Sequence, residues 1–178
     1  MTFEEKTMKC ERIYEGRIIN VRVDTVELPN KKYSKREIVE HPGAVGIIAI
    51  TEDNKIMFVK QFRKPVEEVL LEIPAGKLEP MERPDKCAIR ELEEETGFTT
   101  DRVEKILEFY TTPGFSNEIL HIYLAENLKE GNINPDEDEN IETIQLSIED
   151  ALNKIKTGEI KDAKTIIGVL TYVNLKHK

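Results

Sequence analysis

A group of glutamates near the middle of the chain has the residue type and spacing for metal chemistry. Glu91, Glu94 and Glu95 fall in the run R-E-L-E-E-E-T that begins at Arg90. Residues four apart are neighbours on a helix surface, so Glu91 and Glu95 would repel each other there unless a cation lay between them. A set of carboxylate oxygens without histidine or cysteine favours magnesium or manganese over zinc. The simpler alternative is the solvated face of an ordinary acidic helix.

A helix over residues 84–96 is predicted to position these glutamates. Pro84 suits the first turn of a helix, and Gly97 suits the position just after the last turn. Ala88 and Leu92 lie four residues apart and form an apolar stripe beside the acidic one. The pattern therefore predicts a helix that is packed on one side and acidic on the other.

The segments around this helix predict a small antiparallel β-lobe followed by a larger mixed domain. Three strand candidates precede residue 45, at Cys10–Tyr14, Arg17–Leu28 and Ser34–Glu40. The core sheet is predicted to begin with Ala44–Thr51 and Lys55–Phe62, which a turn-like Glu-Asp-Asn separates. Further strands are expected at Val69–Ile73, Val103–Thr111, Glu118–Ala125 and Ile141–Leu146, and closing helices after Ser147 and over Ala163–Leu175. We place the domain boundary between residues 43 and 44.

Composition limits the classes of partner. The chain has 178 residues, enough for one substantial domain, and a formal charge of −9. This charge argues against a nucleic-acid or anionic-membrane partner, but it suits small phosphate substrates that metal ions bridge to carboxylates. No apolar run has the length of a membrane span, and the N-terminus lacks the apolar core of a signal peptide. Only Cys10 and Cys87 are present, without metal-ligand spacing, so we expect a protein of the reducing cytoplasm.

The glutamates belong to a longer pattern with a specific spacing. Nine specified positions across 23 residues read G-x5-E-x7-R-E-U-x-E-E-x-G-U, from Gly76 to Phe98. This segment resembles the Nudix box at every defined position, in a strand–loop–helix setting. The resemblance implies an α/β (α+β) fold in which a mixed sheet is sandwiched between helices, so that residues 44–178 would form a Nudix hydrolase domain. It also implies that the loop and helix of the box hold a divalent metal.

The resemblance assigns roles to the residues of the box. Glu91 and Glu95 would be metal ligands, Glu94 would contribute further to catalysis, and the carbonyl of Ala75 would be an additional ligand. In the family the arginine at the position of Arg90 orients the glutamates, and its place four residues before Glu94 allows a salt bridge. An ordinary surface Arg–Glu pair would have the same geometry.

An acidic stretch at residues 136–139 completes the expected catalytic set. Family position favours Glu137 as the general base and Glu139 as a metal ligand. Four adjacent acids leave this assignment open, and without the box a solvated acidic loop would be the preferred interpretation.

A second pattern narrows the substrate class. Thr112, Pro113, Gly114 and Glu118 match an S/T-P-G-x-x-x-E element, with the proline sixteen residues after Gly97. This element is similar to that of the ADP-ribose pyrophosphatase subgroup, although Pro-Gly is also a common turn. Further similarity occurs in three segments, Ser34–Gly43, Gln61–Arg63 and Glu72–Gly76.

The subgroup implies Mg²⁺-dependent hydrolysis of ADP-ribose to AMP and ribose 5-phosphate, with Mn²⁺ as an alternative ion. Rival interpretations are a Nudix hydrolase of another nucleoside diphosphate sugar or of a dinucleotide polyphosphate, a Nudix-fold sensor without catalysis, and an acidic interaction domain without a ligand.

Substrate contacts are expected at Arg36, Arg63, Gly114 and Glu118. Guanidinium groups pair well with phosphate oxygens, and both arginines occupy matched places in the family pattern. The subgroup exchanges its N-terminal lobe across a homodimer, which would carry Arg36 into the partner's site. That expectation comes from the resemblance alone.

Overall fold

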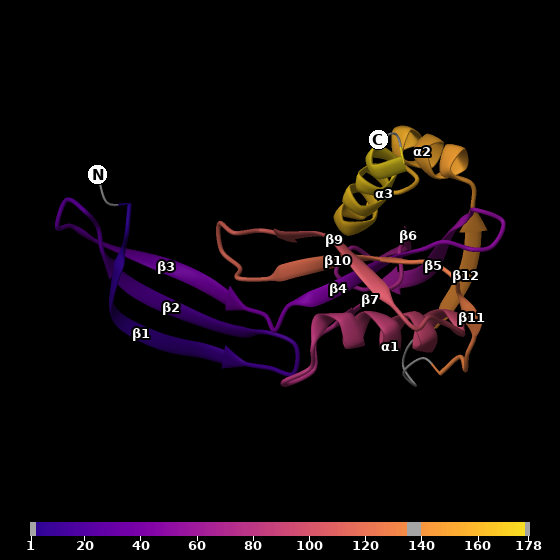
Figure 1. Ribbon diagram of the computed structural model, residues 1–178. Helices are drawn as coiled ribbons and strands as arrows, with labels where there is room; N and C mark the ends of the chain where they lie inside the picture. The colour runs from indigo at the N-terminus through magenta and orange to yellow at the C-terminus, as the bar shows by residue number, and fades with distance from the viewer. Residues whose placement is uncertain (1–2, 135–139, 177–178) are drawn as a thin grey trace. The chain divides into compact units, whose positions relative to one another are not determined.

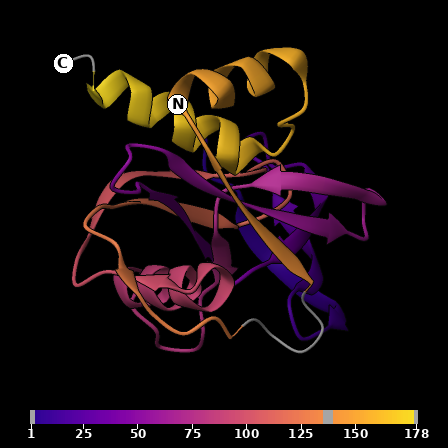
Figure 2. The ribbon, with the colours of Figure 1, turned by 90° about the vertical axis from the view of Figure 1, so that its right-hand side faces the viewer.

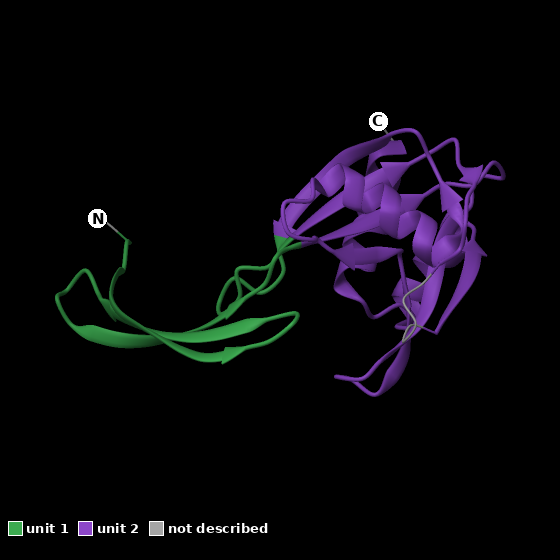
Figure 3. Ribbon diagram, turned by 90° about the horizontal axis from the view of Figure 1, so that it is seen from below, with its two compact units in different colours: residues 1–43, 110–119 green, residues 44–109, 120–178 purple. Residues whose placement is uncertain are grey.

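The computed structural model describes residues 3–134 and 140–176 (Figure 1). The chain forms two compact units, which Figure 3 colours separately. The first contains residues 1–43 together with 110–119, and the second contains residues 44–109 and 120–178. Sequence patterns do not reveal that the 110–119 segment joins the N-terminal strands, because the association depends on contacts across more than 70 residues of chain, such as Val39 N to Phe115 O at 2.7 Å.

The first unit is built on an antiparallel sheet, as expected. Its strands are β1 (Lys6–Glu15), β2 (Asn20–Glu27) and β3 (Tyr33–Glu40), hydrogen-bonded in the order β1-β2-β3. β1 begins four residues before the predicted start because Lys6 and Thr7 pair with Glu27 and Val26 across the sheet. Every residue of β1 is exposed to solvent in the single chain.

The second unit contains a mixed sheet and an antiparallel sheet. The mixed sheet has the order β7-β4-β10-β9, with β4 parallel to β10 and antiparallel to β7. Its strands are β7 (Ala75–Lys77), β4 (Ala44–Ala49), β10 (Ile119–Ala125) and β9 (Val103–Tyr110). The antiparallel sheet has the order β12-β5-β6, with β12 (Ile141–Leu146), β5 (Ile56–Arg63) and β6 (Glu68–Glu72).

Helices cover both sides of these sheets. Figure 2 shows α1 (Pro84–Thr96) on one side and α2 (Ile148–Thr157) and α3 (Ala163–Lys176) on the other. Side chains of β4 alternate between the two layers, as a strand requires. Ile47 packs in a buried cluster with Leu92 of α1, whereas Ile48 packs in a second cluster with Val169 of α3. The predicted helix–sheet–helix sandwich with a mixed sheet is therefore confirmed.

Three short strands were not predicted. They are β7, β8 (Phe98–Thr99) and β11 (Lys129–Glu130), and β8 and β11 pair with each other in a two-stranded sheet. Segments of two or three residues have no readable periodicity, and they become strands through pairing with distant chain. Among the helices that the structure describes, none is long and apolar enough to cross a bilayer.

Candidate active site

The glutamates lie on α1, whose two ends explain its position in the chain. Arg83 is extended before the first turn, with φ −79° and ψ 136°, and Pro84 occupies the first helical position. Gly97 adopts the left-handed conformation with φ 71°, and its N–H donates to the carbonyl of Glu93. A residue with a side chain is disfavoured in that conformation, so glycine ends the helix there. The predicted bounds of this helix, 84–96, are those observed.

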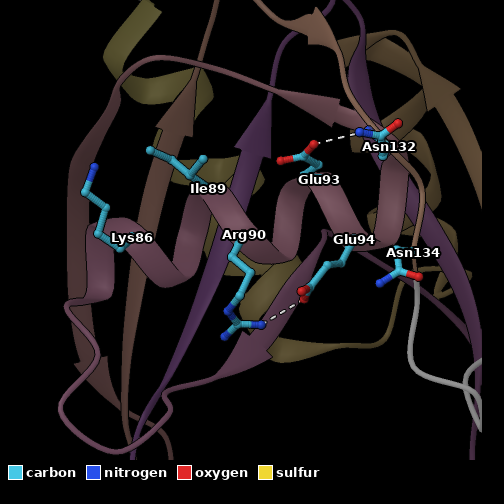
Figure 4. A pocket seen from close by; sticks show the side chains of 7 residues that line it. All are labelled: Lys86, Ile89, Arg90, Glu93, Glu94, Asn132 and Asn134. Atoms are coloured by element: carbon cyan, nitrogen blue, oxygen red, sulfur yellow. Dashed lines mark hydrogen bonds and ion pairs between the residues drawn. The ribbon is translucent and has the colours of Figure 1, made fainter.

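Arg90 gathers three glutamates around one guanidinium group. Its Nε and Nη2 donate to the two carboxylate oxygens of Glu82, each at 2.9 Å. Its Nη1 donates to Glu91 Oε1 and to Glu94 Oε2, each at 2.8 Å, and Figure 4 shows the bond to Glu94. Hydrogen bonds from Arg90 lower the pKa of Glu82 to about 2 against the opposing effect of burial, and hydrogen bonds with Glu82 raise the pKa of Arg90. The arginine therefore fixes the directions of carboxylates from both the loop and the helix.

Glu91 and Glu95 lie against the strand that precedes the loop. A Cβ atom on Gly76 would fall 1.8 Å from the carboxyl carbon of Glu91 and 1.9 Å from its Oε1, so only glycine leaves room for this carboxylate. Glu95 is 3% exposed, and its Oε2 accepts a hydrogen bond from the N–H of Ala75 at 3.0 Å. The structure thus brings Ala75, Gly76, Glu91 and Glu95 together.

This arrangement fits a hard divalent cation. Its side-chain donors are all carboxylate oxygens, one of them almost fully buried, and such ions take oxygen ligands. In the described ranges 3–134 and 140–176, no group of three or more histidine, cysteine, aspartate or glutamate side chains is arranged to hold a metal ion. Glu137 and Glu139, the remaining acids of the expected set, lie outside the described residues.

Arg63 is held by a buried carboxylate in the same unit. Its Nε and Nη2 donate to the two carboxylate oxygens of Glu72, at 2.8 and 2.9 Å, and Lys164 of α3 donates to the same carboxylate. Burial would raise the pKa of Glu72, which is 1% exposed, but the two cations outweigh burial and lower it. Hydrogen bonds with Glu72 raise the pKa of Arg63, and the charge of Glu95 adds to this effect. The guanidinium is therefore fixed in direction while its side chain stays 38% exposed.

The other expected substrate contacts belong to the first unit. Arg36, on β3, donates from Nε and Nη2 to the carboxylate of Glu5, at 2.9 and 2.6 Å. Glu118 accepts a hydrogen bond from Thr111 Oγ1 at 2.6 Å, and its Oε1 lies 3.6 Å from Nδ1 of His41. Gly114 lies in the turn that Phe115 N closes onto Thr112 O at 3.1 Å.

Sequence reasoning assigned no role to Glu72 or Lys164. The one sequence feature that could have indicated this ion pair was Glu72 itself, a single acid near the end of the apolar strand candidate Val69–Ile73. A carboxylate in such a place is buried only if it is paired, which predicts a cation nearby but not which one. Lys164 is 92 residues away, and only the packing of α3 brings it to Glu72.

Comparison with known proteins gives two adjoining matches. Residues 40–167 match the model of the NUDIX domain, and residues 5–39 match the model of the nucleoside diphosphate sugar hydrolase N-terminal domain. Together these matches span both units of the structure.

Individual relatives cover nearly the whole chain. An ADP-ribose pyrophosphatase of Bacillus subtilis (strain 168) is 51% identical over 177 residues, which is 98% of this chain and 95% of the relative. A methanol dehydrogenase activator of Bacillus methanolicus is 52% identical over 182 residues, 99% of this chain and 98% of the relative. The crystal structure of an ADP compounds hydrolase superposes with a TM-score of 0.86 at 19% identity, covering 97% of this chain and 94% of that one, which shows a shared fold.

Proposed function

The chain belongs to the Nudix family, and from that premise we propose that it hydrolyses the pyrophosphate bond of ADP-ribose, with magnesium, to AMP and ribose 5-phosphate. The observation that carries the proposal is the arrangement of Glu82, Glu91 and Glu94 around Arg90, with Glu91 seated on Gly76. All the glutamates of the box are present, which supports a hydrolase over a ligand-binding protein without catalytic activity. The similarity over nearly the full chain to an ADP-ribose pyrophosphatase supports the substrate.

Nudix hydrolases generally use divalent metal ions, and we assign the metal site to the carboxylates of Glu91 and Glu95 and the carbonyl of Ala75. Glu139, outside the described residues, would complete it. A Mg²⁺ or Mn²⁺ ion held there would stabilise negative charge on phosphate oxygens and lower the pKa of a water molecule bound to it. Arg90 holds the carboxylates of Glu91 and Glu94 in place, so that little reorganisation is needed at the moment of reaction.

The reaction needs a group that accepts a proton from water. The oxygen of water forms a bond to one phosphorus atom while the bond from that phosphorus to the bridging oxygen breaks, and the second phosphate leaves with its electron pair. We assign proton acceptance to Glu137. Glu94 would contribute to catalysis beside the metal ligands. Glu137 lies outside the described residues, and its neighbouring acids remain rivals for the role.

Cationic side chains would bind the diphosphate. Arg63 suits this role because Glu72, which also accepts from Lys164, fixes its guanidinium before substrate arrives, and this lowers the entropy cost of binding. Arg36 would add a second guanidinium from the N-terminal lobe, and Gly114 and Glu118 further contacts. We propose all four residues as substrate contacts.

A homodimer with exchanged N-terminal lobes is part of the proposal. Met8, Ile13 and Tyr14 of β1 are 49%, 58% and 57% exposed, and large apolar side chains that gather on one exposed strand mark a candidate interaction surface. A second copy of the chain could cover this surface. We further propose a cytoplasmic setting, which suits two cysteines that are both free thiols.

A second candidate function is stimulation of a methanol dehydrogenase. The observation that favours it is the 52% identity to a methanol dehydrogenase activator, which matches the identity to the ADP-ribose pyrophosphatase.

A substrate panel separates these functions. Purified protein with Mg²⁺ would be offered ADP-ribose, ADP-glucose, GDP-mannose, diadenosine polyphosphates and NADH, and kcat/KM would be measured for each. We expect the highest value for ADP-ribose. Stimulation of a methanol dehydrogenase without turnover of ADP-ribose would support the second candidate instead.

A further inference from the structure

A buried carboxylate of β6 is shared between Arg63 and a lysine of α3. Glu72 is 1% exposed, and its two oxygens accept the bidentate pair from Arg63 at 2.8 and 2.9 Å. Lys164 donates to Glu72 Oε2, the oxygen that also accepts from Nη2 of Arg63. The side chain of Lys164 is 13% exposed, compared with 38% for Arg63. Of the two cations, Arg63 is therefore the more accessible to a dissolved anion.

The first turn of α3 places Lys164 against the end of β6. Asp162 caps this helix, because its Oδ2 accepts from Thr165 N at 2.9 Å and from Thr165 Oγ1 at 2.6 Å. The same Oδ2 lies 3.1 Å from Nζ of Lys164. Thr165 Oγ1 in turn accepts from the N–H of Ile73, the residue after Glu72, at 2.8 Å. These contacts join α3 to the end of the strand, at the backbone of Ile73 and at the side chain of Glu72.

The contact from Lys164 restricts the direction of the carboxylate. A bidentate pair holds a guanidinium and a carboxylate in a defined mutual geometry, so the direction of the Arg63 guanidinium follows that of the Glu72 carboxylate. The last torsion of a glutamate has only a broad preference, and the pair could therefore turn as a unit. A third donor to one carboxylate oxygen, from a different element of the fold, removes this freedom.

We propose that Lys164 is a positioning residue, which acts through Glu72 to hold the guanidinium of Arg63 in the direction that binds the diphosphate of the substrate. This inference rests on the proposed function, in which Arg63 contacts the diphosphate. In a purely structural role, Lys164 would only balance the buried charge of Glu72 and add to the stability of the fold. Loss of the positioning role would instead weaken substrate binding, because an arginine that is free to move must be ordered when substrate arrives.

Three substitutions separate these roles. Lys164→Met removes the ammonium group and keeps a long unbranched side chain. Lys161→Met is the matched control, because it breaks an exposed ion pair with Glu68, at the other end of β6, in which Nζ and Oε2 lie 2.6 Å apart. Thr165→Val is the second control, because it removes the hydrogen bond from Ile73 N and leaves the lysine in place. If Lys164→Met is not folded by circular dichroism, Lys164→Gln replaces it, since glutamine removes the same charge and keeps a polar end group.

The first measurement is the exchange with solvent of the proton on Nε of Arg63, followed by nuclear magnetic resonance, which requires neither substrate nor metal. Its signal is identified as the one that is absent from Arg63→Lys. We expect exchange to be about tenfold faster in Lys164→Met, because the ion pair opens more often when a donor that fixes Glu72 is lost. Both controls should stay within about twofold of wild type. Unchanged exchange in Lys164→Met would overturn the proposal at its first step, and equally fast exchange in Thr165→Val would overturn it in favour of a general loosening of α3.

The second measurement is steady-state hydrolysis of ADP-ribose by the same variants. We expect KM to rise by about three- to tenfold in Lys164→Met, with kcat changed by less than about twofold, because the ordered guanidinium would bind substrate and transition state alike. Both controls should keep the wild-type KM. Faster exchange with a wild-type KM, or a loss of kcat without a rise in KM, would overturn the positioning role.

Failure of the proposed function would give a different result. If wild type leaves ADP-ribose intact, the proposed substrate is wrong, and the same comparison is made with whichever substrate of the panel it hydrolyses. If it hydrolyses none, the part of this inference that concerns substrate is also wrong. The exchange rates still decide whether Lys164 fixes Arg63, because that measurement uses the protein alone.

Discussion

Arg90 and Glu82 form a bidentate ion pair, in which Nε and Nη2 of the arginine each lie 2.9 Å from a different oxygen of the carboxylate. Glu82 belongs to the loop before α1, and Arg90 belongs to the helix. The pair leaves Nη1 to contact Glu91 and Glu94. One planar group thus links the loop to two glutamates of the helix.

Arg90→Lys should impair catalysis although the positive charge is kept. A lysine ammonium cannot contact Glu82 through two parallel bonds and also reach Glu91 and Glu94. We expect kcat to fall by about a hundredfold, while circular dichroism shows an intact fold. A double-mutant cycle with Glu82→Gln should give a coupling energy in unfolding of about 0.5–3 kcal/mol. Strictly additive effects would mean that the ion pair has no energetic role.

Gly76→Ala should alter the use of metal more than the stability of the fold. The new Cβ would overlap the Glu91 carboxylate, which is 1.8 Å from that position, so the carboxylate must leave Gly76. We expect the Mg²⁺ concentration for half-maximal activity to rise by about tenfold or more, because disturbing a group that positions a metal ligand typically costs about 10- to 100-fold in metal affinity. Titration of activity with Mg²⁺ measures the change. Lys86→Ala is the control for the titration, because Lys86 is an exposed residue of α1 that has no role in the proposed metal or substrate site.

Glu72 should make stability depend on acid pH in a predictable direction. Its pKa is lowered in the folded state, whereas a glutamate in the unfolded chain has a pKa of about 4.3. As the pH falls, the unfolded state binds a proton first. The stability that Glu72 contributes is therefore complete above about pH 4.3 and is lost as the pH falls through the lower folded value.

Glu72→Gln tests this dependence. The variant leaves Arg63 and Lys164 without their buried counter-charge, so we expect the free energy of unfolding at neutral pH to fall by about 3 kcal/mol. Its stability should also decline less steeply than that of wild type below about pH 4.3. Urea unfolding at a series of pH values measures both effects, with exposed Glu104→Gln as the control. A decline parallel to that of wild type would show that Glu72 is not the responsible group.

Much of the fold follows from local sequence signals. Pro84 and Gly97 gave the bounds of α1 because each residue has a backbone preference that suits one end of a helix. Ser147 likewise caps the start of α2, where its side chain accepts a hydrogen bond from Asp150 N. In the mixed sheet, β4, β9 and β10 were predicted because each is long enough to show an apolar run or an alternating pattern. The three-residue β7 was missed because it is a strand through its pairing with β4.

The sequence revealed the motif of the site, but it predicted only some of the contacts within the site. Spacing on a helix predicted the bond between Arg90 and Glu94, since residues four apart are neighbours. Helical spacing could not predict the hydrogen bonds of Arg63 to Glu72, or the hydrogen bond from Asn132 N to Glu93. Those contacts join segments that are far apart in the chain and are brought together by the packing of sheets and loops, which no local sequence pattern predicts.

Ile13→Glu should weaken the proposed dimer. Ile13 is 58% exposed on β1, and a second copy that covers this strand would bury it. A buried unpaired carboxylate is costly, so we expect the mass by light scattering to fall from twice the chain mass of 20.5 kDa toward that mass at micromolar concentration. Glu11→Gln, on the same strand, is the control and should stay dimeric. A wild-type protein that is itself monomeric would contradict the proposal.

The most direct test of the central claim is product analysis of ADP-ribose incubated with the wild type and with Glu95→Gln, each with Mg²⁺ and then with a chelator. We predict AMP and ribose 5-phosphate in equal amounts from wild type with Mg²⁺, and a loss of at least about a hundredfold in rate for the folded Glu95→Gln variant or after chelation. Persistence of ADP-ribose with wild type and Mg²⁺ would contradict the proposed substrate, and undiminished hydrolysis by Glu95→Gln would contradict the proposed metal site.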